Sequence, residues 1–94
     1  MTYELMFHPA ALAEWRKLDG SIRAQLVKKL QERLHNPRVP AAQLSGEPDR
    51  YKIKLRSVGY RLVYEVRAGE LVVLVVAVGK RERNAAYKTA SRRP

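Results

Sequence analysis

Residues 51–66 read YKIKLRSVGYRLVYEV, and this stretch decides the fold because it predicts two strands joined by a short turn. In its first half, basic residues alternate with apolar ones, and successive side chains of a strand point to opposite faces of a sheet. The apolar row is expected to pack into a core. The basic row, Lys52, Lys54 and Arg56, is held out towards a partner. Across the turn, Arg61 is expected to share the face of Lys52 and Lys54.

The segments around this hairpin predict a small α+β fold. An N-terminal strand is predicted at residues 3–7, and a two-helix hairpin follows at residues 9–18 and 21–34, with Pro9 at the first helical position and Ser21 as an N-cap. A Pro- and Gly-containing loop at residues 37–50 returns the chain to the sheet.

Three further strands are predicted at residues 50–56, 60–66 and 71–78, in a mostly antiparallel sheet. The connections SVG and RAGE are short enough for hairpins with glycine at the strained position. The last strand, LVVLVVAV, is apolar throughout, so we expect it to be covered on both faces. A short C-terminal helix or tail ends the chain.

Length and charge favour one basic domain, residues 1–94. The net charge is +10, with 8 Lys and Arg against 6 Asp and Glu in the first 50 residues and 11 against 3 in the rest. A polyanion such as nucleic acid fits this imbalance, because basic residues that neutralise phosphates release counterions. The chain has no cysteine, which excludes disulfides and thiolate metal sites. It has no long apolar segment, so we expect a cytoplasmic protein without membrane contact.

Three motifs together resemble the RelE branch of bacterial toxin–antitoxin ribonucleases: EWRKL at 14–18, the hairpin at 51–66, and VGKRER at 78–83 followed by Tyr87. The resemblance implies a RelE/ParE-like fold and a metal-independent endoribonuclease, or mRNA interferase, which needs no cofactor. It also implies a toxin that acts in the ribosomal A site, on messenger RNA beside small-subunit rRNA. A RelB-like antitoxin would hold it inactive, and only the complex would bind operator DNA, as a co-repressor.

The resemblance also implies a catalytic set, and all its members are present: Lys52, Lys54, Arg61, Arg81 and Tyr87. Further basic residues nearby are candidates for RNA binding: Arg50, Arg56, Lys80 and Arg83. The chain departs from the family at Ser45, where related members tend to carry an arginine that helps to hold the substrate. Arg50 is a candidate to replace that charge.

RNA is cleaved without a metal when its own 2′-hydroxyl attacks the adjacent phosphorus, which requires a base, stabilisation of charge and protonation of the leaving oxygen. We assign the base to Lys54 or Tyr87, because crowded cations lower the pKa of a lysine and favour a phenolate. Lys52 and Arg61 would stabilise the phosphorane, and Arg81 would hold the phosphate and assist the leaving oxygen. The two histidines lie outside this region of the sequence.

Three alternatives remain open at the level of sequence. The basic row could simply protect an exposed strand from aggregation. A toxin of the same fold, similar to the ParE branch, would bind a topoisomerase without catalysis. A plain nucleic-acid-binding module would bind tightly in low salt without cutting the strand.

Overall fold

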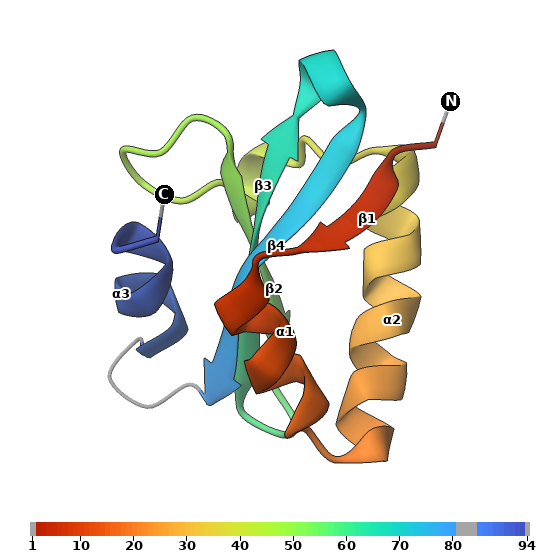
Figure 1. Cartoon of the computed structure of the whole chain (residues 1–94), viewed down its shortest axis with the longest axis vertical. Helices are drawn as coiled ribbons and strands as arrows, with labels where there is room; N and C mark the ends of the chain where they lie inside the picture. Colours follow the sequence, from red (N-terminus) through yellow and green to blue (C-terminus); the bar gives the residue numbers. More distant parts are fainter. Residues whose placement is uncertain (1, 81–84, 94) are drawn as a thin grey trace.

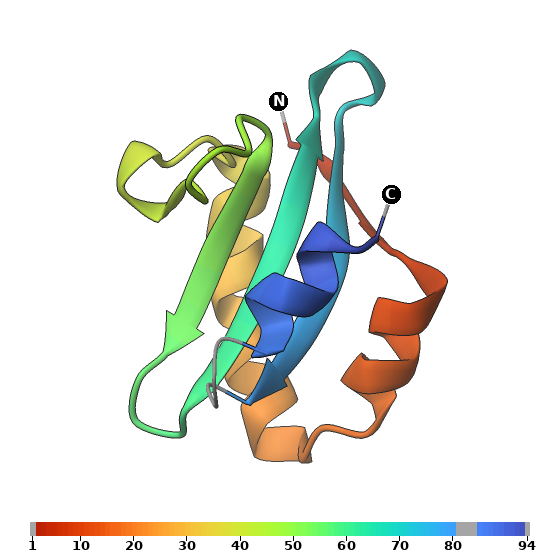
Figure 2. The ribbon, with the colours of Figure 1, turned by 90° about the vertical axis from the view of Figure 1, so that its left-hand side faces the viewer.

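A computed structural model describes residues 2–80 and 85–93, and it has a four-stranded mixed sheet with helices on both faces (Figures 1 and 2). The elements in chain order are β1 (Glu4–Phe7), α1 (Pro9–Arg16), α2 (Gly20–His35), the 3-10 turn η1 (Pro40–Ala42), β2 (Arg50–Leu55), β3 (Tyr60–Arg67), the 3-10 turn η2 (Ala68–Glu70), β4 (Val72–Lys80) and α3 (Ala85–Ser91). This arrangement confirms the predicted α+β fold. Of the two forms that the sequence left open for the C-terminal segment, helix or tail, residues Ala85–Ser91 take the helical one.

The sheet order is β1-β4-β3-β2. β1 pairs with β4 in parallel, and the other two pairs are antiparallel. In Figure 2, α3 crosses the face of the sheet that is turned to the viewer, and α2 lies behind the sheet. Among the described residues, no helix is both long enough and apolar enough to cross a membrane.

The core lies on both faces of β4, as its apolar sequence predicts, and every residue from Val72 to Val78 is buried. On one face, β4 packs with residues of α1 and α2 such as Ala11, Leu26 and Leu30. On the other face, a smaller cluster joins Val63, Val76, Ala77 and Ala90. The pairing of β3 with β4 shifts register after Val63, which lets Val76 and Ala77 both face this second cluster.

The helix boundaries differ from the prediction by one or two residues. α1 begins at Pro9, as expected, but its last turn tightens through a bond from the Leu18 amide to the Trp15 carbonyl, so the helix ends at Arg16. α2 begins at Gly20, and its N-cap is Asp19. The prediction of Ser21 as N-cap was therefore wrong: Ser21 is the second residue of the helix, and its exposed hydroxyl donates to Asp19 Oδ2 at 3.0 Å.

One of the two predicted glycine turns is confirmed. Gly59 takes a φ of +70° in the turn from β2 to β3, which only glycine adopts at low cost. In the turn from β3 to β4, the left-handed residue is Leu71, with φ 55°, and not Gly69. The reason is that Ala68–Glu70 form a complete 3-10 turn, so the reversal of the chain falls on the next residue.

Candidate active site

The hairpin of β2 and β3 places three cations on the same face of the sheet. Lys54 lies directly opposite Arg61, and Lys52 lies opposite Val63, which belongs to the core cluster beneath α3. The intervening residues, among them Ile53, point to the other face and are buried. The alternation that the sequence predicts therefore turns Lys52, Lys54 and Arg61 towards the side that carries α3.

Tyr87 reaches this group from α3. The guanidinium carbon of Arg61 lies 4.9 Å from the centre of the Tyr87 ring, a cation–π distance. The Tyr87 hydroxyl is buried, and within residues 2–80 and 85–93 it has no hydrogen-bond partner. The structure thus brings together four members of the predicted catalytic set. The fifth, Arg81, lies outside the described residues, as does the RNA-binding candidate Arg83.

The charge states of Lys54 and Tyr87 separate the two candidate bases. The pKa of Lys54 is lowered, chiefly by the charge of Lys52. Burial and the charges of Arg61 and Arg56 lower it further. Burial raises the pKa of Tyr87, and the nearby Arg61 offsets this only in part. The expectation that nearby cations favour the phenolate form of Tyr87 was therefore wrong. Burial disfavours the charged phenolate oxygen, and this outweighs the attraction of Arg61. Lys54 is the group that loses a proton more easily than usual.

Two adjoining pockets open beside these cations. One, of about 240 Å³, is lined by Lys54, Leu55, Arg56, Tyr60 and Arg61. The other, of about 340 Å³, lies between α2 and the edge of the sheet and is lined by Arg33, Val39, Ala41, Ala42, Lys52, Lys54 and Arg56. Both contain Lys54 and Arg56, so they form one basic depression along β2. A phosphate chain fits such a lining, since Lys54 and Arg56 border both pockets and further cations lie in each.

Arg33 is a further basic residue of this depression, and it is not among the site residues that the sequence predicted. Its guanidinium donates to the Lys52 carbonyl at 3.2 Å and to the Tyr64 hydroxyl at 2.9 Å. Tyr64 in turn donates to the Pro37 carbonyl at 2.6 Å. A signal was available, because Arg33 follows the buried Leu30 by three residues and therefore lies near the same helix face.

Arg56 and Lys80 lie at one end of the sheet and are exposed. Arg56 directly follows β2, and Lys80 ends β4 opposite Tyr60, the first residue of β3. Both therefore remain candidates for contact with RNA at the end of the sheet where Lys54 and Arg61 lie.

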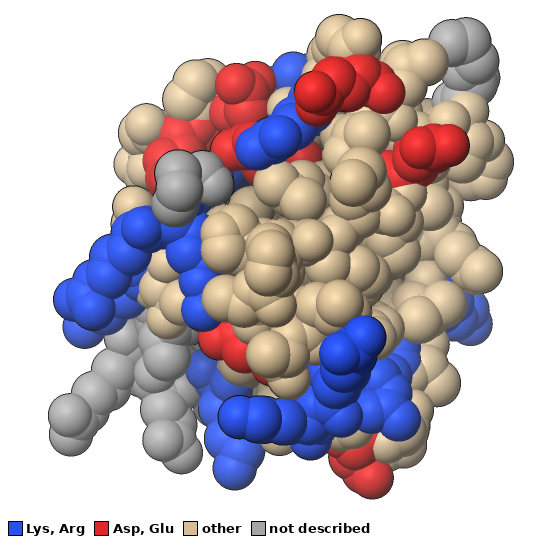
Figure 3. All heavy atoms as spheres, viewed as in Figure 1, with Lys and Arg blue, Asp and Glu red and all other residues tan. Residues whose placement is uncertain are grey.

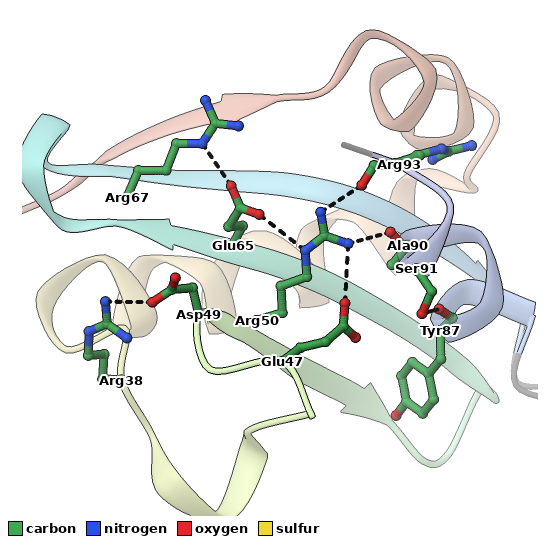
Figure 4. A network of polar contacts seen from close by, with 10 residues as sticks. All are labelled: Arg38, Glu47, Asp49, Arg50, Glu65, Arg67, Tyr87, Ala90, Ser91 and Arg93. Atoms are coloured by element: carbon green, nitrogen blue, oxygen red, sulfur yellow. Dashed lines mark hydrogen bonds and ion pairs between the residues drawn. The ribbon is translucent and has the colours of Figure 1, made fainter. Parts of the chain in front are cut away.

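Arg50, which the sequence made a candidate for RNA binding, is buried. It is 8% exposed, and its Nε donates to Glu65 Oε1 at 3.1 Å while its Nη1 lies 3.6 Å from Glu47 Oε1 (Figure 4). Its remaining N–H groups donate to main-chain carbonyls of the C-terminal segment. A cation that is buried and paired in this way is not available to a phosphate. It does not replace the charge that is absent at Ser45, which is exposed in a turn.

Charge is unevenly distributed over the surface. In the view of Figure 3, acidic side chains gather mainly at the upper end, near the turn between β3 and β4, while basic side chains occupy the lower end and the left side. The lower end is where Figure 1 shows the turn between β2 and β3. On this face, basic side chains therefore gather towards the end of the molecule that holds the turn between β2 and β3.

Comparisons with known proteins agree with this geometry. Residues 5–85 match a family model described as ParE toxin of type II toxin–antitoxin system, parDE. The chain is 56% identical over 93 residues to the mRNA interferase toxin RelE of Escherichia coli K12, which covers 99% of this chain and 98% of that protein. A putative RelE-like toxin protein of Escherichia coli is 52% identical over the same length.

Solved structures give the same result. A free R81A/R83A mutant of E. coli RelE has a TM-score of 0.90 and 53% identity, covering 98% of this chain and 97% of that one. The toxin chain in the intact E. coli RelBE toxin–antitoxin complex has a TM-score of 0.82 and 58% identity, covering 86% of this chain and 99% of that one.

Proposed function

The chain belongs to the family of RelE and ParE toxins of type II toxin–antitoxin systems, and from that premise we propose that it is an endoribonuclease toxin of the RelE branch. The observation that most strongly supports this proposal is the 56% identity to an mRNA interferase along almost the whole of both chains. The family model names ParE, but the relatives that match at full length are RelE proteins. The cations gathered on β2 and β3 suit cleavage of RNA better than binding of a topoisomerase.

In the proposed reaction, Lys54 is the general base. Its lowered pKa raises the fraction of neutral amine that accepts the proton of the 2′-hydroxyl. The oxygen then attacks the adjacent phosphorus, the bond to the 5′-oxygen breaks as that oxygen takes up a proton from solvent, and a 2′,3′-cyclic phosphate forms. Lys52 and Arg61 stabilise the charge that develops on the phosphorane, because both lie on the face of Lys54.

Tyr87 acts in this scheme as a neutral phenol. Its raised pKa keeps the hydroxyl protonated, so that it donates to an oxygen of the substrate. The hydroxyl is buried in the free protein and has no hydrogen-bond partner in the described part of the chain, so it must become accessible when the substrate binds. Arg81 holds the phosphate and assists the leaving oxygen, as the resemblance to RelE implies. Arg33, Arg56, Lys80 and Arg83 provide further charge along the path of the RNA.

The proposed substrate is messenger RNA held in the ribosomal A site, next to small-subunit rRNA. The pockets are small, about 240 and 340 Å³, and neither encloses a stretch of RNA, so the protein by itself supplies little orientation of the attacking hydroxyl. A ribosome that holds the message in an attack-ready geometry would supply it, and such orientation is worth up to roughly 7–11 kcal/mol. This substrate also places the toxin in the cytoplasm.

The proposed inhibitor is a RelB-like antitoxin, by analogy with the E. coli RelBE complex. An acidic or amphipathic segment would neutralise the +10 chain and cover its basic pockets. The complex, and not the toxin alone, would bind operator DNA and repress transcription. In the proposed function, residues 1–94 form a single toxin domain.

Induced expression in a bacterial host tests whether the protein acts as a toxin of the RelE branch or of the ParE branch. Incorporation of labelled methionine and of labelled thymidine is followed over the first minutes, for the toxin, for Lys54→Ala and for Lys28→Ala as a variant with the same charge loss on α2. An RNA-cleaving toxin stops translation first, Lys54→Ala relieves the block, and Lys28→Ala does not. Thymidine incorporation that stops first would instead indicate a topoisomerase inhibitor and would overturn the proposal.

A further inference from the structure

Among the side chains that the structure describes, apolar contact of α3 with the sheet is limited. The helix has seven residues, and the small cluster beneath it unites Ala90 with Val63, Val76 and Ala77, with Tyr87 packed at its border. Alanine and valine bury little area, and burial stabilises in proportion to apolar area. Polar contacts are therefore important in fixing where α3 lies.

Arg50 provides one set of these contacts. Its guanidinium donates to the Ala90 carbonyl and, at 2.7 Å, to the Arg93 carbonyl, while Glu65 and Glu47 hold the same guanidinium from the sheet and the loop (Figure 4). The last carbonyls of a helix have no partner inside the helix, and a cation beside them is favourable. Arg50 thus caps α3 from the first residue of β2.

Glu14 and Arg93 provide a second set from the other side. Arg93 Nη1 donates to Glu14 Oε1 at 2.9 Å, and Arg93 Nη2 donates to Glu14 Oε2 at 3.3 Å. The pair is two-pronged, which fixes its geometry as well as its distance. It joins Arg93, two residues beyond the end of α3, to α1, and its side chains are only 17% and 33% exposed.

The same pair is anchored to the backbone of β4. β1 pairs with β4 only as far as Val75, so the next groups along that edge have no strand beside them. Arg93 Nη1 donates to the Val76 carbonyl at 2.8 Å, and the Val78 amide donates to Glu14 Oε1 at 3.2 Å. Glu14 and Arg93 therefore take the place of the missing strand, and this ties the end of α3 to the most buried strand of the sheet.

We propose that Arg50 and the Glu14–Arg93 pair are positioning residues for the cleavage reaction, which hold α3 so that Tyr87 stays against Arg61. Tyr87 lies one turn before the clamped carbonyls, and the Ser91 hydroxyl donates to its carbonyl at 3.0 Å, so the ring moves with the clamped end of the helix. This inference rests on the proposed function of Tyr87. Misplacement of a reacting group by about 1 Å can cost about 10²-fold in rate.

The test uses Glu14→Gln and Arg93→Ala, with Arg92→Ala as control, because Arg92 is exposed and its removal takes the same charge from the same segment. Glu14→Gln keeps an acceptor for the Val78 amide, so this variant retains the hydrogen bond at the edge of β4. Single-turnover cleavage on programmed ribosomes gives the rate constant and the half-saturating ribosome concentration. In parallel, 3-fluorotyrosine at position 87 reports its surroundings by fluorine NMR.

We expect the rate constant to fall about 10- to 100-fold for Glu14→Gln and Arg93→Ala, with the half-saturating concentration changed less than about twofold. The fluorine signal shifts in both variants, and Arg92→Ala changes neither measurement. A fluorine signal and a rate constant that stay at the wild-type values in both variants would overturn the inference.

The Tyr87→Phe background separates this inference from the proposed function. If the pair acts through Tyr87, Arg93→Ala adds little to the loss caused by Tyr87→Phe, so the two effects are not additive. Full additivity would contradict a positioning role. If Tyr87→Phe alone leaves the rate unchanged, the role of Tyr87 in the proposed function fails; if it slows cleavage while the variants of the pair do not, only the inference fails.

Discussion

Lys54 is the side chain on which the proposed chemistry depends, and its role as a base differs testably from a role as a mere cation. Arginine in its place keeps the positive charge but holds its proton at any physiological pH. We therefore expect Lys54→Arg to lose as much cleavage as Lys54→Ala, about 10²–10⁴-fold, while ribosome binding of Lys54→Arg stays close to wild type. Single-turnover rates and ribosome pelleting measure the two quantities. Substantial activity in Lys54→Arg would mean that Lys54 supplies only charge.

Lys52 sets the protonation of Lys54, which gives a prediction for the pH dependence of cleavage. The base acts as a neutral amine, so the rate rises with pH through the pKa of Lys54, which lies below the usual lysine value chiefly because of Lys52. Lys52→Gln removes that repulsion and raises the pKa, so the inflection of the pH–rate profile moves to higher pH. Lys52→Arg keeps the charge and should leave the inflection in place. Coincident profiles for Lys52→Gln and wild type would argue against Lys54 as the titrating group.

At the scale of elements, the turn at Gly59 fixes the register that sets Lys54 opposite Arg61. A side chain at φ +70° costs about 1–2 kcal/mol, so Gly59→Ala should lower the free energy of unfolding by about that amount. Gly69 provides the control, since a Cβ there meets nothing within 4 Å and its φ is not positive, and Gly69→Ala should be neutral or slightly stabilising. Urea unfolding compares the two. Equal stability of both variants would show that the turn carries no conformational constraint.

The ion-pair network that joins β2, β3 and α3 makes the stability depend on pH. Burial raises the pKa of Glu65, but hydrogen bonds from Arg67 and Arg50 outweigh it, so the net pKa is lowered. A lowered carboxyl pKa stabilises the fold above the unfolded value of about 4.3, and this stabilisation is lost as the pH falls through the folded pKa. Glu65→Gln should therefore reduce the fall in unfolding free energy between neutral and acidic pH. Parallel curves for the variant and wild type, measured by urea unfolding, would exclude Glu65 as the source.

At the scale of the whole molecule, the parts that sequence predicts are those governed by local pattern. The period of two places Lys52, Lys54 and Arg61 on one face, and continuous apolar sequence identifies the buried β4. The role of Arg50 depends on partners at positions 47, 65, 90 and 93, which only the folded chain brings together. The pKa of Tyr87 likewise depends on its burial between α3 and the sheet, which local sequence does not reveal.

Cleavage of messenger RNA on the ribosome is the activity that the proposed function assigns to this basic domain. Primer extension on a message with a defined A-site codon measures this cleavage, with naked RNA and the Lys54→Arg variant alongside. We expect discrete cleavage in the A-site codon of the ribosome-bound message, much weaker cutting of naked RNA, and loss of the product with Lys54→Arg. An intact message on ribosomes that have bound the protein would contradict the proposed function.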